Sequence, residues 1–539
     1  MRVELSVPVS AEFDAEIARL LADRVPSRIA DRDGTVFTDA AVAGDRLGWV
    51  DLPSRAEELL TEIEELRERL ADAGLRSISL TGMGGSSLAP EVMATAAGVD
   101  LEIVDSTDPN QVAEAIGTDL DHTVLVIASK SGTTIETDAI RRAFAAAFEA
   151  VGIDPASRFI AITDPGTELD ALATEQGYLA TFHGDPSVGG RFSALSPFGL
   201  VPAGLAGVDV RQIVASAAAI ASDLTLDSED NPALRFGTWL GIAHARATEK
   251  LVLADTSPAL RGLGAWVEQL VAESLGKDGQ GILPVVVDGP GDIGFADARA
   301  DAVLCTLGSD ADFGAPSGFN AVVDGDLGEQ FLFWEFATAI AGYSIGVDPF
   351  DQPDVEAAKA FARAALDQGA QNDEYPVFAD GDVEVYGDVD EATDLVGALR
   401  ELFGSVDEYG YIGVQAYLDR LGDAGAADLR PLVSRHAGVQ TTFGFGPRYL
   451  HSTGQYHKGG HPNGVFLQIT ADPRTELLVP GRGYGFAELQ RAQALGDAAA
   501  LRERGRPVLR LHLTDRARGL DQVRQAITAI EPHHHYGVD

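Results

Sequence analysis

Between residues 77 and 163, short runs of hydrophobic residues alternate with stretches in which the hydrophobic residues have helical spacing. Four short apolar runs, each ending in small or polar residues, have the length and composition of β-strands. They are Ser77–Thr81, Leu101–Asp105, Thr123–Ser129 and Phe159–Thr163. Helical spacing separates them, as in Pro90–Ala97 and Glu136–Ala150. This alternation predicts an α/β fold with a parallel sheet covered by helices, and in such sheets ligands bind at the carboxyl ends of the strands.

The rest of the chain contains a helical start and a second strand–helix series. Residues 11–72 have an acidic, Ala/Leu-rich helical pattern, and a long helical region is expected over 210–253. The later apolar runs are Ile282–Val287, Ala302–Leu307, Asn320–Asp324, Thr441–Phe445, Val465–Ile469 and Val508–Leu513, with a strong helix at Phe331–Tyr343. We predict an N-terminal helical segment over 1–70, a first sheet domain over 71–208, and a second over 209–539. The second includes an acidic insertion near 370–410 and an extended C-terminal region.

Composition narrows the possible settings and partners. A chain of 539 residues is too long for a single hydrophobic core, so we expect at least two domains. Cys305 is the only cysteine in the sequence, so no intrachain disulfide is possible. We see no signal peptide and no apolar run of roughly 20 residues, so a cytoplasmic protein without a membrane span is expected. Lys and Arg number 40 against 83 Asp and Glu, a net charge of −43, which disfavours nucleic acid and anionic membranes as partners. Adaptation to high salt and an ordinary solvated surface explain this acidity equally well.

One loop points to an anion. Ser129, Lys130, Ser131, Gly132, Thr133 and Thr134 follow a predicted strand and precede a predicted helix. The loop combines hydroxyls, a lysine, a glycine that permits close backbone approach, and a helix N-terminus whose N–H groups and dipole attract negative charge. An ordinary Ser/Thr cap is the plain alternative, and phosphate binding is the interpretation we favour.

A glycine-rich loop at residues 81–87 allows two interpretations. Thr81-Gly82-Met83-Gly84-Gly85-Ser86-Ser87 follows a strand, and Asp105 lies about where a dinucleotide-binding fold places its ribose-binding acid. Ser87, however, replaces the third glycine of that fingerprint. The other interpretation is that the loop lines the anion pocket and Ser86 contributes a hydroxyl.

Four further segments carry candidate chemistry. Arg191 stands in the glycine frame 189–193, and Gln269 and Glu273 share one face of a helix expected to end at Gly276. The segment 350–359 has an Asp-Gln-Pro helix start followed by a lysine, and 451–461 is the densest polar cluster of the chain. Lysine occurs only at 130, 250, 277, 359 and 458, and all but the second fall in these motifs. The histidines of 451–461 have no acidic or Cys partner at metal spacing, so acid–base work or a hydrogen-bonded loop is favoured over zinc.

In this order, the segments from about Leu80 to Leu513 resemble the glucose-6-phosphate isomerase family, which is built from two sugar-isomerase (SIS) domains. The resemblance is nearest to the isomerase portion of transaldolase/glucose-6-phosphate isomerase fusion proteins. It implies that phosphate is held by Ser86, Ser129, Lys130, Ser131 and Thr134. It also implies that Glu273 is the base that moves the proton between C1 and C2, with Gln269 nearby, and that Arg191 stabilises the charged intermediate.

The resemblance further implies that a lysine and a histidine open the sugar ring. Gln352 and Lys359 match the family's Asp-Gln-x-x-Val-Glu-x-x-Lys segment. The family's histidine precedes that segment, whereas here the similar Gly-Gln-Tyr-His sequence follows it. His457 is therefore expected to reach the pocket from a rearranged second domain, and His451 is the second candidate.

The expected function is interconversion of glucose 6-phosphate and fructose 6-phosphate through an enediolate, without metal or cofactor. Alternatives are an isomerase that also accepts mannose 6-phosphate, a non-catalytic SIS-type sensor of sugar phosphate, and a dinucleotide enzyme. A sensor would not need Glu273, Lys359 and His457, and it would usually carry a basic DNA-binding segment, which this sequence lacks. The only expected partners are the sugar phosphate and, by resemblance, a second copy of the chain in a homodimer.

Overall fold

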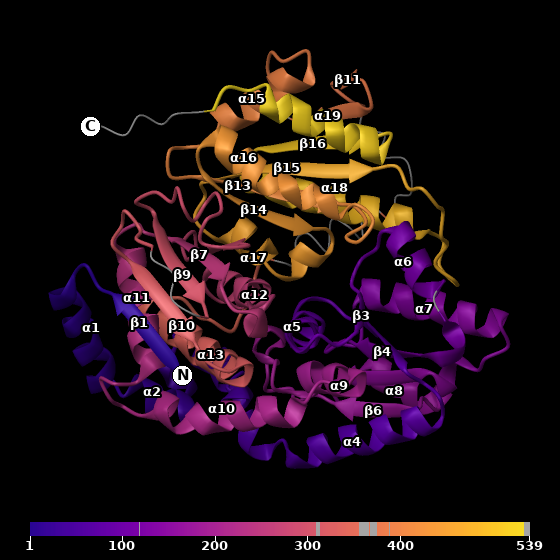
Figure 1. The fold of residues 1–539 in the computed structure, drawn as a ribbon, viewed down its shortest axis with the longest axis horizontal. Coiled ribbons are helices and arrows are strands. Elements are labelled where there is room, and N and C mark those ends of the chain that lie inside the picture. Colours follow the sequence, from indigo (N-terminus) through magenta and orange to yellow (C-terminus); the bar gives the residue numbers. More distant parts are fainter. Residues whose placement is uncertain (118, 309–312, 355–365, 367–374, 388, 533–539) are drawn as a thin grey trace.

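The computed structural model describes residues 1–539 except 118, 309–312, 355–365, 367–374, 388 and 533–539. Figure 1 shows three β-sheets, each with helices packed against it, and the third sheet lies above the other two. The fold is α/β, as the alternation of apolar runs and helices predicted. The three consecutive histidines near the C-terminus, His533 to His535, fall outside the described residues, as does Lys359.

The first sheet is entirely parallel, with the order β3-β2-β4-β5-β6. Its strands are β2 (Ser77–Thr81), β3 (Glu102–Val104), β4 (Thr123–Ala128), β5 (Phe159–Thr163) and β6 (Ala180–His183). The helices of this part are α5 (Leu88–Ala97), α6 (Pro109–Ile116), α7 (Ile135–Ala150), α8 (Glu168–Gln176) and α9 (Pro197–Ala206). All six residues of β4 are buried, because helices cover both faces of the sheet. The predicted strands agree with the structure to within one residue at each end.

The second sheet has the order β1-β10-β9-β7-β8, with β1 antiparallel at its edge. Its strands are β1 (Arg2–Ser6), β7 (Lys250–Asp255), β8 (Leu283–Val287), β9 (Ala302–Leu307) and β10 (Asn320–Asp324). Its helices are α10 (Val210–Thr225), α11 (Pro232–Ala245), α12 (Leu263–Leu275) and α13 (Leu327–Ile345). The expected helix over 210–253 is wrong at its end, because residues 250–255 form a buried central strand.

The N-terminal segment is mostly helical but does not start as a helix. After the edge strand β1 come α1 (Ser10–Ala22), α2 (Val25–Ala30), α3 (Ala40–Gly44) and α4 (Glu57–Asp72). Pro26 lies in the first turn of α2, where a missing N–H costs nothing. The segment therefore does not stand apart: β1 pairs with the second sheet and α1 packs on α11, whereas α4 packs against α9 beside the first sheet.

Residues beyond 377 form a third sheet of their own, with the order β11-β12-β16-β15-β13-β14. Its strands are β11 (Phe378–Asp380), β12 (Val383–Gly387), β13 (Tyr411–Tyr417), β14 (Gln440–Phe445), β15 (Gly464–Ala471) and β16 (Val508–Leu513). Its helices are α15 (Leu395–Gly404), α16 (Leu429–Ala437), α17 (Gly454–Gly459), α18 (Phe486–Glu503) and α19 (Arg516–Thr528). The acidic stretch expected as an insertion supplies the β11–β12 edge and α15, because Val383, Val385 and Leu395 are buried there.

Three arginines, of which Arg516 is buried and Arg420 and Arg448 are half-buried, join the third sheet to the first. Arg448 contacts both Asp105, which follows β3, and Glu91 of α5. Arg420 donates to Glu91 at 2.6 Å, and Arg516 pairs with Asp108 at 2.7 Å. Removing one partner of such a buried pair leaves an uncompensated charge, so these contacts fix how the two parts meet.

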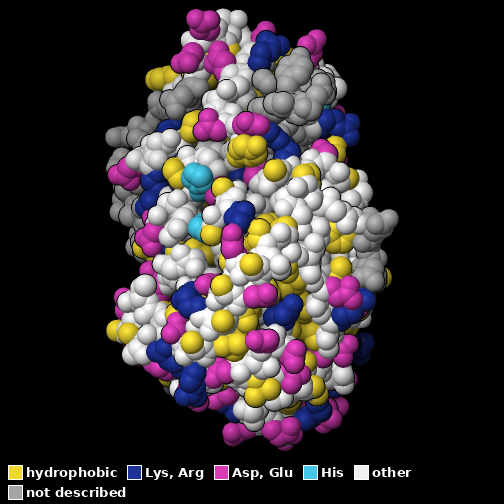
Figure 2. Space-filling model, turned by 90° about the vertical axis from the view of Figure 1, so that its left-hand side faces the viewer, with side chains coloured by type: hydrophobic (Ala, Val, Ile, Leu, Met, Phe, Trp, Pro, Cys, Tyr) yellow, Lys and Arg dark blue, Asp and Glu magenta, His cyan; other side chains and the backbone are white. Residues whose placement is uncertain are grey.

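Acidic side chains are dispersed over the face of the molecule shown in Figure 2. On the face shown in Figure 2, Asp and Glu side chains are interspersed with Lys, Arg and single hydrophobic side chains. Among the described residues, no helix is both long enough and apolar enough to cross a membrane.

Candidate active site

The predicted anion loop opens into a cavity with a volume of about 590 Å³. The loop joins β4 to α7, as its sequence indicated, and it meets residues of the third sheet across the cavity. The lining includes Ser129, Ser131, Gly132, Thr133, Thr134, Glu136, Arg141, Arg142, Leu450, His451, Lys458, Arg482 and Gln493. The site is thus shared between two sheets that are far apart in sequence.

The hydroxyls of the loop are already organised by one another. Ser129 Oγ lies 2.9 Å from Thr134 Oγ1, and Ser131 Oγ lies 3.0 Å from Thr133 Oγ1. Thr134 is the N-cap residue of α7, yet its side chain does not cap the helix. The first N–H groups of α7 and its dipole therefore face the loop without a side-chain acceptor from Thr134, an arrangement that suits an anion.

Two of the predicted phosphate ligands lie elsewhere. The Lys130 ammonium pairs with Asp164 at 2.5 Å and donates to the carbonyl of Asp185 at 3.2 Å, and Lys130 does not line the cavity. Ser86 ends a short turn beginning at Gly84 and also lies outside the lining. The structure therefore brings Ser129, Ser131 and Thr134 together but not the side chains of Lys130 and Ser86.

Arg191 is buried at the centre of the predicted catalytic cluster. Its guanidinium donates to Ser274 Oγ at 2.8 Å, to Glu273 Oε2 at 3.5 Å and to Gln352 Oε1 at 3.3 Å. It also donates to the carbonyls of Pro349 at 2.5 Å and Asp351 at 2.9 Å. Burial lowers the pKa of Arg191, while the nearby carboxylates oppose that shift. A single arginine thus joins three segments in a water-poor setting.

Glu273 lies in the last turn of α12, which ends at Leu275 with Gly276 as its C-cap, as expected. The carboxylate accepts from Gln269 Nε2 at 3.4 Å, so the predicted helix-face pair exists. Burial raises the pKa of Glu273 above its usual value, and Arg191, Gln269 and His451 act in the opposite direction. A carboxylate whose pKa burial raises and a nearby cation lowers is suited to accept and return a proton.

Lys277 belongs to this cluster although it was not among the predicted site residues. Its ammonium donates to the carbonyl of Asp348 at 2.5 Å and to the carboxylate of Asp351 at 2.5 Å. Burial lowers the pKa of Lys277 to about 8. Lys277 and Arg191 both donate to the carbonyl of Asp351 and so hold the same segment. The scarcity of lysine in the sequence was the signal that could have identified Lys277 as a site residue.

His451 connects the Glu273 cluster to the cavity. Its carbonyl accepts from Gln269 Nε2 at 2.9 Å, and its ring nitrogen Nε2 lies 3.1 Å from Glu136 Oε1 on the cavity wall. Gln493 donates to the same Glu136 oxygen at 2.7 Å. No sequence signal marked Gln493, because it lies in the middle of α18 and reaches the site only through tertiary packing.

His457 points into a different environment from the one expected. Its side chain is enclosed by aromatic rings: Nδ1 lies 3.0 Å from the Tyr411 hydroxyl, and the ring centroid is 5.0 Å from that of Phe466. The residue is 2% exposed, and burial holds the pKa of His457 well below its usual value. The structure does not bring His457 to the cavity. The neighbouring Lys458 lines the cavity and pairs with the buried Asp497 at 2.5 Å.

The glycine-rich loop serves close packing. Gly84 has φ +54°, and a Cβ there would stand 2.5 Å from the carbonyl oxygen of His451. A Cβ on Gly85 would stand 1.9 Å from the carbonyl oxygen of Gly190, next to Arg191. Asp105, the proposed ribose ligand of the dinucleotide interpretation, is 1% exposed and is engaged by Arg448. The glycines therefore allow the loop to lie close to the segments that contain His451 and Arg191. The Asp105 carboxylate, which a dinucleotide site would need for the ribose, is instead paired with Arg448.

Metal ligation has no support in the part of the chain that the structure describes. There, no group of three or more His, Cys, Asp or Glu side chains is arranged to hold a metal ion. The chemistry available is that of a carboxylate base, a buried guanidinium, a histidine and an anion loop.

The chain is similar to known proteins over the first sheet and part of the second. The family profile described as Phosphoglucose isomerase matches residues 62–302. A glucose-6-phosphate isomerase of Rubrobacter xylanophilus is 29% identical over 411 residues, covering 64% of this chain and 93% of its own. A probable glucose-6-phosphate isomerase of Haloarcula marismortui is 31% identical over 290 residues, covering 53% of this chain and 65% of its own.

Two solved structures share the fold. A hypothetical protein from Thermus thermophilus has a TM-score of 0.58 at 25% identity, over 68% of this chain and all 100% of that one. A glucose-6-phosphate isomerase from Chlamydia trachomatis has a TM-score of 0.50 at 23% identity, over 57% of this chain and 73% of that one. The matched range 62–302 contains the anion loop, Arg191 and Glu273, whereas His451 lies beyond it. The chain is therefore similar in sequence to glucose-6-phosphate isomerases, and it shares an α/β fold with both solved structures.

Proposed function

We propose that this chain is an aldose–ketose isomerase that interconverts glucose 6-phosphate and fructose 6-phosphate. The observation that carries the proposal is the buried pair of Glu273 and Arg191, 3.5 Å apart, beside a cavity that contains an anion loop. The names of the relatives agree with this activity. A sensor would need the anion loop but not a buried base next to a buried cation.

The phosphate of the substrate binds at the start of α7. The loop contributes the hydroxyls of Ser129, Ser131 and Thr134. The first N–H groups of the helix are further donors, because the Thr134 side chain does not cap them. Fixing the phosphate there orients the sugar carbons toward His451 and, behind it, Glu273.

Glu273 transfers the proton. Its carboxylate removes the proton from C2 of the open aldose, the C1–C2 double bond forms, and the carbonyl oxygen takes negative charge as an enediolate. The same carboxylic acid then returns the proton at C1, while the hydroxyl proton of O2 passes to O1, so that O2 becomes the carbonyl oxygen of the ketose. Arg191 offsets the developing charge, and a preorganised donor of this kind contributes about 3–4 kcal/mol to transition-state stabilisation.

Ring opening falls to His451 rather than to His457 in this proposal. The His451 side chain is 22% exposed on the cavity wall and is oriented by Glu136, whereas His457 is enclosed by aromatic rings. The resemblance also implies Lys359 in this step, and that residue lies outside the described part of the chain. Gln352, which precedes Lys359 in the same sequence motif, accepts a hydrogen bond from Arg191 at 3.3 Å.

Isomerisation measured in heavy water tests the function. The wild-type protein should convert either sugar phosphate into the other and incorporate deuterium at the transferred position. Glu273→Gln should lose both signals together while keeping its circular dichroism spectrum. A wild-type protein that binds the sugar phosphates without converting them would overturn the proposal in favour of a sensor.

The two histidines provide a matched pair. His451→Gln should slow isomerisation about 10²-fold, because a positioned acid–base group is lost. His457→Gln should leave the rate nearly unchanged and lower the free energy of unfolding by about 1–3 kcal/mol, because its buried bond to Tyr411 is disturbed. The reverse result would return the ring-opening role to His457.

A further inference from the structure

A second cavity, of about 350 Å³, lies in the third sheet beneath helix α18. Its walls come from β12, β15, β16, the end of β13 and the first turns of α18. The lining comprises Glu384, Tyr386, Tyr417, Thr470, Ala471, Asp472, Pro473, Ala487, Glu488, Gln490, Arg491, Ala494, Leu495, Arg510 and His512. None of these residues belongs to the candidate active site, so this cavity is a separate feature of the chain.

The cavity occupies the place in the sheet where ligands are expected. The parallel strands follow one another in the chain as β13, β14, β15 and β16, but in space their order is β14-β13-β15-β16. The strand order therefore reverses between β13 and β15. Tyr417 ends β13 and Thr470 lies near the end of β15, and both line the cavity. Crevices at the carboxyl ends of strands beside such a reversal are the usual ligand sites of open α/β sheets.

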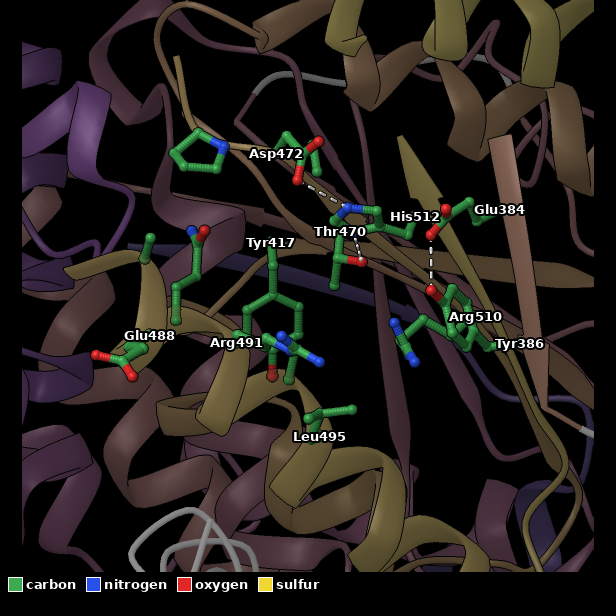
Figure 3. Close-up of a pocket in the computed structure, with 15 residues that line it drawn as sticks. Glu384, Tyr386, Tyr417, Thr470, Asp472, Glu488, Arg491, Leu495, Arg510 and His512 are labelled. Atoms are coloured by element: carbon green, nitrogen blue, oxygen red, sulfur yellow. Dashed lines mark hydrogen bonds and ion pairs between the residues drawn. The ribbon is translucent and has the colours of Figure 1, made fainter. Parts of the chain in front are cut away.

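The donors in this cavity converge on one space. Figure 3 shows Arg491 and Arg510 reaching toward each other from α18 and β16, with Tyr386 and Tyr417 beside them. Arg510 is 7% exposed, and its guanidinium lies 3.9 Å from the centroid of the Tyr386 ring. Gln490, 5% exposed, has a buried Nε2 with no hydrogen-bond partner among the described residues. An unsatisfied buried donor beside two guanidinium groups calls for an acceptor.

The acidic side chains of the cavity are already engaged. Glu384 accepts from the Tyr386 hydroxyl at 2.6 Å, and Asp472 lies 3.2 Å from His512 Nε2, as the dashed lines in Figure 3 indicate. Glu488 accepts from the backbone N–H of Gly485 at 3.4 Å. These carboxylates therefore leave the Gln490 amide without an acceptor in the described part of the chain.

We propose that this cavity binds a small phosphorylated metabolite, with its phosphate between Arg491, Arg510 and the Gln490 amide and its carbon part against Ala494 and Leu495. Guanidinium groups pair with phosphate through two parallel hydrogen bonds, which a carboxamide donor can complement. The volume lies at the lower end of the range for small-molecule sites, which fits a compact metabolite. The site does not depend on the proposed isomerase activity.

Calorimetric titration with glycerol 3-phosphate tests the site, because this probe carries one phosphate on a small carbon body. The phosphate loop near Ser129 also attracts the probe, so the titration uses the full chain carrying Ser129→Ala and Thr134→Ala. This protein should bind one equivalent, and adding Arg491→Gln should weaken the affinity at least about tenfold. Glycerol, which lacks the phosphate, should give no heat of binding.

Two controls keep the result interpretable. Arg400→Gln removes the same charge from an exposed position of α15 outside the cavity and should leave the affinity unchanged. Arg510→Lys keeps a charge but not the planar fork, and it should weaken binding even if Arg491→Gln unfolds the protein. Affinity within twofold of the parent in both cavity variants, or no binding at millimolar probe, would overturn the proposal.

Discussion

Two buried glutamates of this protein differ in their surroundings. Glu273 of α12 is 5% exposed, and Glu335 of α13 is 0% exposed; burial raises the pKa of both. Glu273 accepts hydrogen bonds from Gln269 and Arg191 next to the anion cavity. Both carboxylate oxygens of Glu335 are buried and have no hydrogen-bond partner among the described residues.

The comparison teaches that burial alone does not make a catalytic acid. Glu335 has the larger shift in pKa, yet no described residue forms a hydrogen bond with its carboxylate, so its natural state is the neutral acid. Glu273 combines the same burial with a neighbouring cation, and through Gln269 it is connected to His451, which lines the cavity.

The largest expected effect separates the two glutamates by activity. Glu273→Gln should lower kcat about 10²–10⁴-fold, because the proton-transfer group is lost. Glu335→Gln, a matched substitution in the adjacent helix, should leave kcat within twofold. Steady-state isomerase assays at saturating substrate measure both. Equal losses in the two variants would mean that Glu273 acts through the fold rather than through chemistry.

Removing the positive charge of Arg191 should raise the pKa of Glu273, as burial without a neighbouring cation does for Glu335. Arg191→Gln should lower kcat/KM about 10²–10³-fold, since charge on the intermediate is no longer offset. The acidic limb of the pH–rate profile should also move to higher pH, because Arg191 is the main influence that lowers the pKa of Glu273. The control Arg191→Lys retains a charge and should move the limb less. An unmoved limb in both variants would refute the coupling.

Replacing Glu335 by an apolar residue should change the free energy of unfolding. Glu335→Met replaces an unpaired buried carboxyl by an apolar side chain of similar volume. It should raise the free energy of unfolding at neutral pH by about 1–3 kcal/mol. Urea denaturation measures the change. A loss of stability would indicate that Glu335 has a polar partner outside the described residues.

The smallest expected effect is a pH dependence of unfolding. The pKa of Glu335 in the folded protein lies well above its value of 4.5 in the unfolded chain, so the folded state binds the proton more tightly. The stability from this proton is therefore fully present below pH 4.5 and is lost as pH rises through the folded pKa. Glu335→Gln should flatten this fall, whereas Arg400→Gln, at an exposed position of α15, should not. Parallel unfolding curves for wild type and Glu335→Gln across pH would contradict the assignment.

Much of the fold followed from local pattern. The strands at Ser77–Thr81 and Phe159–Thr163 were predicted with their observed bounds, because short apolar runs buried on both faces have few other solutions. The errors arose where sequence neighbours are not spatial neighbours. Lys250–Asp255 continued a helical pattern but pairs between β8 and β9, and the acidic stretch near 380 completes the edge of a sheet whose centre lies further along the chain.

The candidate site divides in the same way. The anion loop, the Gln269–Glu273 helix face and the frame around Arg191 were visible in the sequence because each is a local motif. Lys130 and His457 have the residue types expected of site groups, but Asp164 and an aromatic enclosure engage their side chains.

Local sequence was sufficient to predict the α/β class, the strand–loop–helix arrangement around Ser129–Thr134 and the helix that carries Glu273, since these depend on spacing within a few residues. Contacts between distant segments, in contrast, turn His451 rather than His457 toward the cavity and bring Gln493 to it. They also assemble the residues beyond 377 into a third sheet with a cavity of its own. Periodicity and motif spacing do not encode such contacts, because the burial and surroundings of a side chain are set by segments far away in the chain.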